Sequence, residues 1–347
     1  MRQVMYIKGL NGIRAIAATV LLLGHASQID FAQWFTNNGL SQSGRIDYLP
    51  VCCAYVFFVI SGFLSGFKSS KNKPLKDYFE KKAKRILPLY YFYIACSIIT
   101  FALLGRIDEI ANVNLLFYLF PVPQLPFTGC GTAILPLVHL WFIGSLLLFY
   151  FVFPIVEKLS GNKIFRISLV IAICWFLLKC GLYIFVGKGT FVYKFVGVSA
   201  LDCLFGGVAL GVLVKKGNNV INKIVNSNII AVIAWLLFLA SGVYGNYIPS
   251  PVRVEYMAII TGLLILSQLN AKPIINLENR VCNWVGGISY EIYVMQILVI
   301  ILLSTLYLNF NLHLQAVCIY LSVVITVILV AWGTNKLIGE ILKVGIP

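Results

Sequence analysis

Two ionisable side chains, Arg14 and His25, stand inside an apolar run near the N-terminus. Eleven positions separate them, which on an α-helix is about 1100°, or roughly three turns plus about 20°. Both side chains therefore leave one face of a helix, about 16 Å apart along its axis. Imidazole suits general-base catalysis near neutral pH, and guanidinium suits phosphate recognition. Ionisable groups are costly inside a membrane helix, so the pair predicts a functional site on a common conduit through the protein interior.

The most basic stretch of the chain follows the second apolar run. Eight cations between Lys68 and Arg85 are accompanied by only two acids, Asp77 and Glu80. One interpretation is a cytosolic loop that contacts anionic lipid headgroups. The other is a phosphate site made by Lys82 and Arg85, which lie one helical turn apart at the mouth of the third run. The two interpretations are compatible, and a phosphate-bearing cytosolic donor would suit such a patch.

Four further polar or aromatic residues are candidates for contact with a substrate. His139 and Trp141 are predicted at the outer end of the fourth run, where His139 has either a hydrogen-bonded structural role or contacts substrate. Tyr290 and Glu291 lie in or near the ninth run. Glu291 is either the partner of a basic group or a solvated interfacial acid.

The other notable residues are interpreted as packing features. The second run carries small residues at helical spacing, which would let a neighbouring helix approach closely: Ser61, Gly62, Ser65 and Gly66. A pair between Lys179 and Asp202 within the apolar runs is conceivable, but the sequence does not fix it. The nine cysteines are scattered, so we expect them to pack in the interior and predict neither a metal site nor a disulfide framework.

The composition is that of a helical membrane protein. Of the 347 residues, 60% are hydrophobic and 11% charged, and the mean hydropathy is +0.91. The sequence predicts a single all-α polytopic domain over residues 1–347, with about ten transmembrane helices and no separate soluble domain. The candidate spans are residues 9–30, 47–67, 86–104, 137–156, 166–186, 194–214, 229–247, 254–270, 284–306 and 312–335.

The distribution of basic residues predicts the orientation of these spans. With the N-terminus in the cytosol, inside segments hold 20 of the 27 lysines and arginines and outside segments hold five. This excess predicts that both termini are cytoplasmic and that the protein crosses the cell membrane several times. The net charge of +15 is then a consequence of topology, and we expect no nucleic-acid partner. The first span is expected not to be a removable signal peptide.

The order of the motifs resembles the acyltransferase-3 family of integral membrane acyltransferases. The motifs are G-L-N-G-I-R-A-I-A-A with L-L-G-H, F-F-V-I-S-G-F-L, K-R-I-L-P-L-Y-Y, H-L-W-F-I-G-S-L-L-L-F-Y-F-V-F-P and G-G-I-S-Y-E-I-Y. The resemblance implies about ten membrane helices and transfer of an acyl group, often acetyl from acetyl-CoA, to hydroxyls of surface or secreted glycans. Arg14 and His25 match the family's arginine–histidine pair, whose histidine is thought essential to transfer.

Three positions depart from that family pattern. Lys82 stands where the family often has the first of two arginines, three positions before Arg85. Ser145 stands where many members have a glutamate, and Gln296 stands where many have a histidine. These departures concern the acceptor and the donor phosphates, and they leave the Arg14–His25 pair intact.

We therefore expect transfer of acetyl or another short acyl group from cytosolic acyl-CoA to a glycan hydroxyl, with no metal. The predicted catalytic residues are His25 and Arg14. Donor binding is predicted for Arg14, Lys82 and Arg85, and acceptor binding for the four candidates: His139, Trp141, Tyr290 and Glu291. The expected partners are a glycan or lipid-linked sugar acceptor, membrane lipid and a second copy in a homodimer. The alternatives are a transporter or flippase for a glycan or lipid-linked sugar, and a structural subunit of a glycan-assembly complex. The sequence does not distinguish an acetyl from a succinyl donor.

Overall fold

The computed structural model describes residues 7–28, 48–69, 74–131, 134–217, 219–244, 247–309 and 316–344. Among these residues the regular structure is helical, with no strand. The α-helices are α1 (Leu10–Gln28), α3 (Tyr48–Phe67), α4 (Leu75–Leu103), α5 (Ile107–Ala111), α6 (Leu116–Leu119), α7 (Gln124–Thr128), α8 (Trp141–Ser160), α9 (Ile164–Phe185), α10 (Phe191–Ser199), α11 (Leu201–Lys216), α12 (Asn219–Val225), α13 (Asn228–Tyr244), α14 (Ser250–Gln268), α15 (Arg280–Gly287), α16 (Ser289–Asn309) and α17 (Ala316–Val344). The short 3-10 helices η1 (Val138–Leu140) and η2 (Gly161–Lys163) flank α8.

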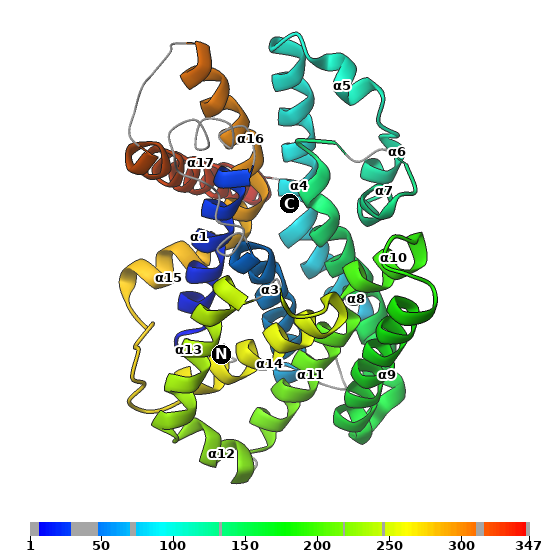
Figure 1. The fold of residues 1–347 in the computed structure, drawn as a ribbon, viewed down its shortest axis with the longest axis vertical. Coiled ribbons are helices and arrows are strands. Elements are labelled where there is room, and N and C mark those ends of the chain that lie inside the picture. The colour runs from blue at the N-terminus through cyan, green and yellow to red at the C-terminus, as the bar shows by residue number, and fades with distance from the viewer. Residues whose placement is uncertain are drawn as a thin grey trace.

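The predicted class of an all-α membrane protein is confirmed. Within the described residues, seven helices are long and apolar enough to cross a membrane, or eight if the bent pair α12–α13 forms one span. Two shorter apolar helices, Leu10–Ala26 and Cys52–Phe67, belong to α1 and α3. Figure 1 shows α5 at one end of the molecule and α12 at the other, as expected if these connectors lie on opposite sides of a bilayer.

Several predicted spans differ in detail from the helices. The span 194–214 contains two helices, α10 and α11, which meet at Ala200 in a left-handed conformation with φ of 47°. The span 284–306 likewise divides into α15 and α16. Hydropathy reports apolar length and not backbone breaks, so these interruptions have no signal in it. The predicted ends at 29–30, 47, 245–246 and 312–315 lie outside the described residues.

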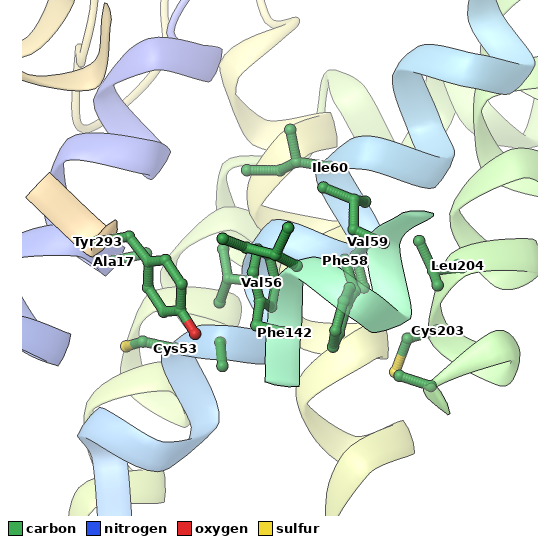
Figure 2. Packing of buried hydrophobic residues seen from close by; sticks show 14 of the residues in the cluster. Ala17, Cys53, Val56, Phe58, Val59, Ile60, Phe142, Cys203, Leu204 and Tyr293 are labelled. Atoms are coloured by element: carbon green, nitrogen blue, oxygen red, sulfur yellow. The ribbon is translucent and has the colours of Figure 1, made fainter. Parts of the chain in front are cut away.

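Helix α3 runs through the core and packs against α1, α11 and α14. Its buried side chains, among them Val56, Phe58 and Ile60, form one apolar cluster with residues of α8, α11 and α16. Figure 2 shows this cluster, in which Phe142 of α8 lies beside Tyr293 of α16 with ring centroids 4.9 Å apart.

The predicted close approach at the small residues of α3 is confirmed, and the partner helix is α11. A Cβ atom added at Gly62 or Gly66 would overlap a backbone carbonyl oxygen of α11. The relation is mutual, because a Cβ at Gly207 or Gly211 would overlap a carbonyl oxygen of α3. With no side chain between them, the two backbones touch directly, as in small-residue interfaces of membrane helices.

Adjacent glycines on α11 provide a matched test of this interface. Gly207→Ala is expected to lower the free energy of unfolding by about 1–3 kcal/mol, because the added methyl group meets the Val59 carbonyl oxygen. Gly206→Ala places the same methyl group in open space and should leave stability unchanged or raise it by up to about 1 kcal/mol. Thermal unfolding of the purified protein in detergent measures both changes. Equal effects at the two positions would contradict this description of the interface.

Candidate active site

A cavity of about 430 Å³ lies between α1, α3, α4, α8 and α16. Five cations contribute to its lining: Arg14, Lys68, Lys81, Lys82 and Arg85. Two carboxylates, those of Asp77 and Glu157, also reach it. Cations therefore outnumber acids in this wall, as they would in a site for a multiply charged anion.

The positive charges of the cavity cations act on one another. Within the described part of the chain, Arg14, Lys82 and Arg85 form no salt bridge. Burial lowers the pKa of the Lys68 ammonium group, and the positive charges of the other four cavity cations lower it further. A phosphate or carboxylate group placed among them would relieve this repulsion and gain charge-assisted hydrogen bonds.

Lys82 is held by aromatic side chains of the cavity wall. Its Nζ atom lies 3.6 Å from the centroid of the Tyr150 ring and 5.7 Å from that of Tyr78. Such cation–π contacts favour the ammonium form and fix its direction. Tyr150 comes from α8, so this contact brings α4 and α8 together at the cavity.

The start of α1, which carries Arg14, is fixed by a distant segment of the chain. The backbone N–H of Gly9 donates to a carboxylate oxygen of Glu278 at 2.7 Å, which satisfies one of the unpaired donors at a helix N-terminus. Asn283 donates to the other oxygen of Glu278, also at 2.7 Å. A Cβ at Gly286 would overlap the Asn11 carbonyl oxygen, so this segment also packs directly on the first turn of α1.

Three aromatic residues form the end of the cavity away from the cations. Of the residues of α3 that line the cavity, Phe57 is the farthest from Lys68 along the helix. Of those on α8, Phe142 is the farthest along the helix from Glu157. Tyr293 is the last lining residue of α16. The ring centroids of Phe57 and Phe142 are 6.2 Å apart, and Phe142 also packs on Tyr293. We call these three side chains the aromatic end.

His25 lies beyond the aromatic end and is not among the residues that line the cavity. Its imidazole interacts with the side chain of Gln296, which follows Tyr293 by one helical turn on α16. Arg14 lines the cavity, and His25, about three turns later on α1, does not. One continuous conduit past both residues therefore stays a prediction.

His139 has a hydrogen-bonded structural environment. Its side chain is buried, and its Nδ1 and Nε2 atoms each lie 3.0 Å from a carbonyl oxygen, of Pro136 and Val294 respectively. The Tyr293 hydroxyl donates to the His139 carbonyl oxygen. His139 therefore joins η1 to α16, and it does not line the cavity.

The other predicted acceptor residues have different surroundings. Tyr290 lines the cavity and donates its hydroxyl hydrogen to the Ile86 carbonyl oxygen at 3.0 Å. Trp141 stacks on Phe127 with ring centroids 5.3 Å apart. Glu291 accepts a hydrogen bond of 2.7 Å from Asn335 of α17. Neither Trp141 nor Glu291 lines the cavity, so a shared acceptor site for the four residues stays a prediction.

Among the polar residues that line the cavity, Lys68, Lys81 and Tyr150 are not identified individually by the sequence analysis. Lys68 and Lys81 belong to the basic stretch, and Lys81 shares a helix face with Arg85 at i, i+4 spacing. That spacing could have identified Lys81. Tyr150 lies in a run of apolar and aromatic residues, where nothing distinguishes a cavity tyrosine from a packed one.

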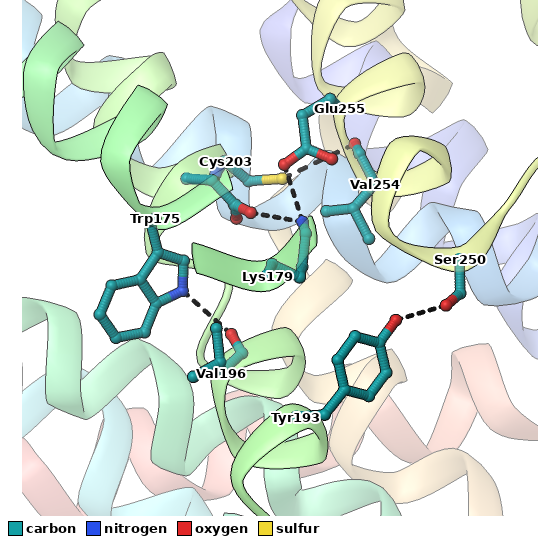
Figure 3. Close-up of polar contacts among 9 residues, drawn as sticks. Trp175, Lys179, Tyr193, Val196, Cys203, Ser250, Val254 and Glu255 are labelled. Atoms are coloured by element: carbon teal, nitrogen blue, oxygen red, sulfur yellow. Dashed lines mark hydrogen bonds and ion pairs between the residues drawn. The ribbon is translucent and has the colours of Figure 1, made fainter. Parts of the chain in front are cut away.

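A buried ion triad lies outside this cavity (Figure 3). The Lys179 ammonium group of α9 forms salt bridges with Asp202 of α11 and with Glu255 of α14, the second at 2.7 Å. The side chains of Lys179 and Asp202 are 1% and 3% exposed. Asp202 also accepts a hydrogen bond of 2.8 Å from the Cys203 backbone N–H. The pair that the sequence left open is therefore present, with Glu255 as a third member.

The helices and the cationic cavity define an integral membrane protein with an internal site suited to anions. Comparison with known families is consistent with this description. A family model described as an acyltransferase domain matches residues 7–336. The chain belongs to this family, the acyltransferase-3 family that its motifs resemble.

Several curated relatives carry acetyltransferase names. The chain is 28% identical over 165 residues to O-acetyltransferase OatA of Staphylococcus aureus (strain NCTC 8325 / PS 47), which covers 44% of this chain and 24% of that protein. It is 25% identical over 341 residues to a provisionally named O-acetyltransferase of strain COL, covering 89% of this chain and 53% of that protein. The matched region is thus about half or less of each relative. No solved structure matches the chain.

Proposed function

We propose that the protein is an O-acyltransferase of the cell membrane that moves acetyl or another short acyl group from cytosolic acyl-CoA to a glycan hydroxyl on the outer side. One observation carries this proposal. A single helix, α1, contributes Arg14 to the lining of the cationic cavity and carries His25 beyond the aromatic end of that cavity. A phosphate-rich donor fits the cavity cations, and a thioester carried on a long thin arm can reach toward the imidazole.

The proposed division of roles follows from the chemistry of each group. Arg14, Lys82 and Arg85 bind the phosphate groups of the donor. His25 accepts the proton of the acceptor hydroxyl as its oxygen attacks the thioester carbonyl carbon. The carbon–sulfur bond then breaks, and the imidazolium returns the proton to the leaving sulfur. The products are an ester and free CoA, with no net change in protons.

The proposed orientation places both termini and the cationic end of the cavity in the cytosol. It is supported by the excess of basic residues on that side. Lys68 and the N-terminal half of α4 then meet the cytosol, where acyl-CoA is available. The segment α5 to α7 lies on the outer side with the acceptor.

Binding of the donor is expected to stabilise the protein. A ligand that binds only the folded state raises stability by RT ln(1 + [L]/Kd), about 2.7 kcal/mol at a concentration of 100 Kd. Acetyl-CoA or CoA is expected to raise the thermal midpoint of unfolding. Arg85→Gln should lower the apparent affinity for CoA about tenfold. Thermal unfolding of the full chain in detergent, titrated with CoA, measures both effects.

Lys84→Gln is the matched control, since it removes a neighbouring cation that pairs with Glu80 outside the cavity. No stabilisation by CoA at millimolar concentration would count against the donor assignment and in favour of a transporter. The acceptor is identified separately, by mass spectrometry of cell-surface glycans from cells with and without the gene. A mass difference names the acyl group, and its carrier names the acceptor.

A further inference from the structure

Two buried side-chain atoms, one on α1 and one on the neighbouring α16, lack hydrogen-bond partners. They are Nδ1 of His25 and Oε1 of Gln296, and neither forms a hydrogen bond within the described part of the chain. The Gln296 side chain is 0% exposed, and its amide interacts with the His25 imidazole across the α1–α16 contact. Leaving a buried polar atom unpaired costs about 1–3 kcal/mol, so the two atoms need an explanation that a packing role alone does not give.

The orientation of the Gln296 amide decides which atom it offers to the ring. Its Nε2 atom donates to the Tyr293 carbonyl oxygen at 3.1 Å, one turn back on α16. One amide hydrogen is therefore directed toward the helix backbone, and the carbonyl oxygen Oε1 is left for another donor. An amide oxygen can only accept a hydrogen bond. The imidazole can satisfy it only by carrying its proton on the facing nitrogen.

We propose that Gln296 is a positioning residue for His25: its Oε1 accepts the Nδ1–H of the imidazole and so holds Nε2 unprotonated as the base. This inference rests on the proposed function, in which His25 accepts the hydroxyl proton. Catalytic hydrogen bonds are often long in a site without substrate and shorten in the reactive complex. In the reaction, Nδ1–H stays on the ring throughout, and only Nε2 gains and then loses the transferred proton.

The surroundings support a neutral partner at this place. His139 is a titratable group whose charge acts on that of His25, and both of its ring nitrogens already contact carbonyl oxygens. It is therefore not available to orient the base. A carboxamide fixes the tautomer without the charge of a carboxylate, which would stabilise the imidazolium and slow the return of the proton to sulfur.

The first test reads the tautomer directly and needs no turnover. Nitrogen-15 NMR of the full chain labelled at its three histidines is expected to show His25, assigned by its loss in His25→Ala, as the Nδ1–H tautomer. Gln296→Leu should convert it to the Nε2–H form or to a mixture. An Nε2–H tautomer in the unchanged protein, or the same spectrum after Gln296→Leu, would overturn the proposal.

The second test separates positioning from stability. With acetyl-CoA as donor and chitotetraose as the sugar probe, Gln296→Leu is expected to lower kcat about 10- to 100-fold, part of the ~10²–10⁴ that a general base supplies. The KM for acetyl-CoA should stay unchanged. Gln296→Glu should restore much of the rate and move the acid limb of the pH–rate profile to higher pH. A structural role alone would not move that limb.

A second buried glutamine supplies the matched control. Gln124 of α7 is 4% exposed, its Oε1 atom has no hydrogen-bond partner among the described residues, and its side chain packs against Gly144 of α8. Gln124→Leu should leave the His25 tautomer and kcat unchanged. If the unchanged chain turns over, His25→Ala does not, and Gln296→Leu matches the unchanged chain, the inference on Gln296 fails while the proposed function stands. If the unchanged chain does not turn over but shows the Nδ1–H tautomer, the proposed donor and acceptor fail and the positioning contact stands.

Discussion

Replacing His25 with alanine is expected to lower the rate of acyl transfer by about 10²–10⁴-fold, the usual contribution of a general base. Binding of CoA should change little, because His25 lies outside the lining of the cationic cavity. The measurement is kcat for transfer from acetyl-CoA, together with the CoA concentration that gives half of the thermal stabilisation. The rate and the CoA affinity should respond separately, because Arg14 lines the cavity and His25 lies beyond its aromatic end.

Arg14→Gln gives the complementary pattern. It should weaken CoA binding and leave the His25 environment intact, since the two residues are eleven positions apart on α1. Turnover that survives His25→Ala at the original rate would remove the basis for the proposed mechanism.

Replacing Lys179 with methionine is expected to destabilise the protein by about 3–5 kcal/mol, the cost of leaving a buried charge without its partner. The change would leave the carboxylates of Asp202 and Glu255 facing each other in the interior. Thermal unfolding in detergent measures the loss. The effect should be large because α9, α11 and α14 each contribute one member of the triad, so that all three helices lose a contact together.

Two further variants separate charge from shape at the triad. Lys194→Met removes an exposed lysine of the neighbouring α10 and should change stability by less than about 0.5 kcal/mol. The triple variant Lys179→Met, Asp202→Asn, Glu255→Gln should recover most of the stability, because buried ion networks are often replaceable by neutral groups. A triple variant as unstable as Lys179→Met would show that the packing of the lysine, and not its charge, stabilises the site.

The helical class and the face of α1 could be predicted from the sequence because both depend on local periodicity. The same holds for the small residues of α3, whose spacing indicated a close helix contact before α11 was known as the partner. Glu255 could not be connected to Lys179, because 76 residues separate them and the register of α14 against α9 is a tertiary property.

In the candidate site, too, residue type and local spacing could be predicted from the sequence, and tertiary contacts could not. Arg14, Lys82 and Arg85 were chosen by residue type and spacing, and the structure brings all three to one cavity. Tyr150, Phe57 and the other aromatic lining residues were not chosen, since an aromatic side chain in an apolar run carries no mark of exposure to a cavity. Gln296 was noticed only as a departure from a family pattern. Its relation to His25 required the packing of α16 against α1.

The direct backbone contact between α3 and α11 bears on how a bulky ligand enters. Interfaces without intervening side chains cannot open by rotamer changes, and Lys215 at the end of α11 also donates to the Ser69 carbonyl oxygen at 2.6 Å. The two helices should therefore move as one rigid body. When a ligand enters, we expect α4 and α8 to move apart. Their shared cation–π contact at Lys82 can separate and re-form without breaking any backbone hydrogen bond.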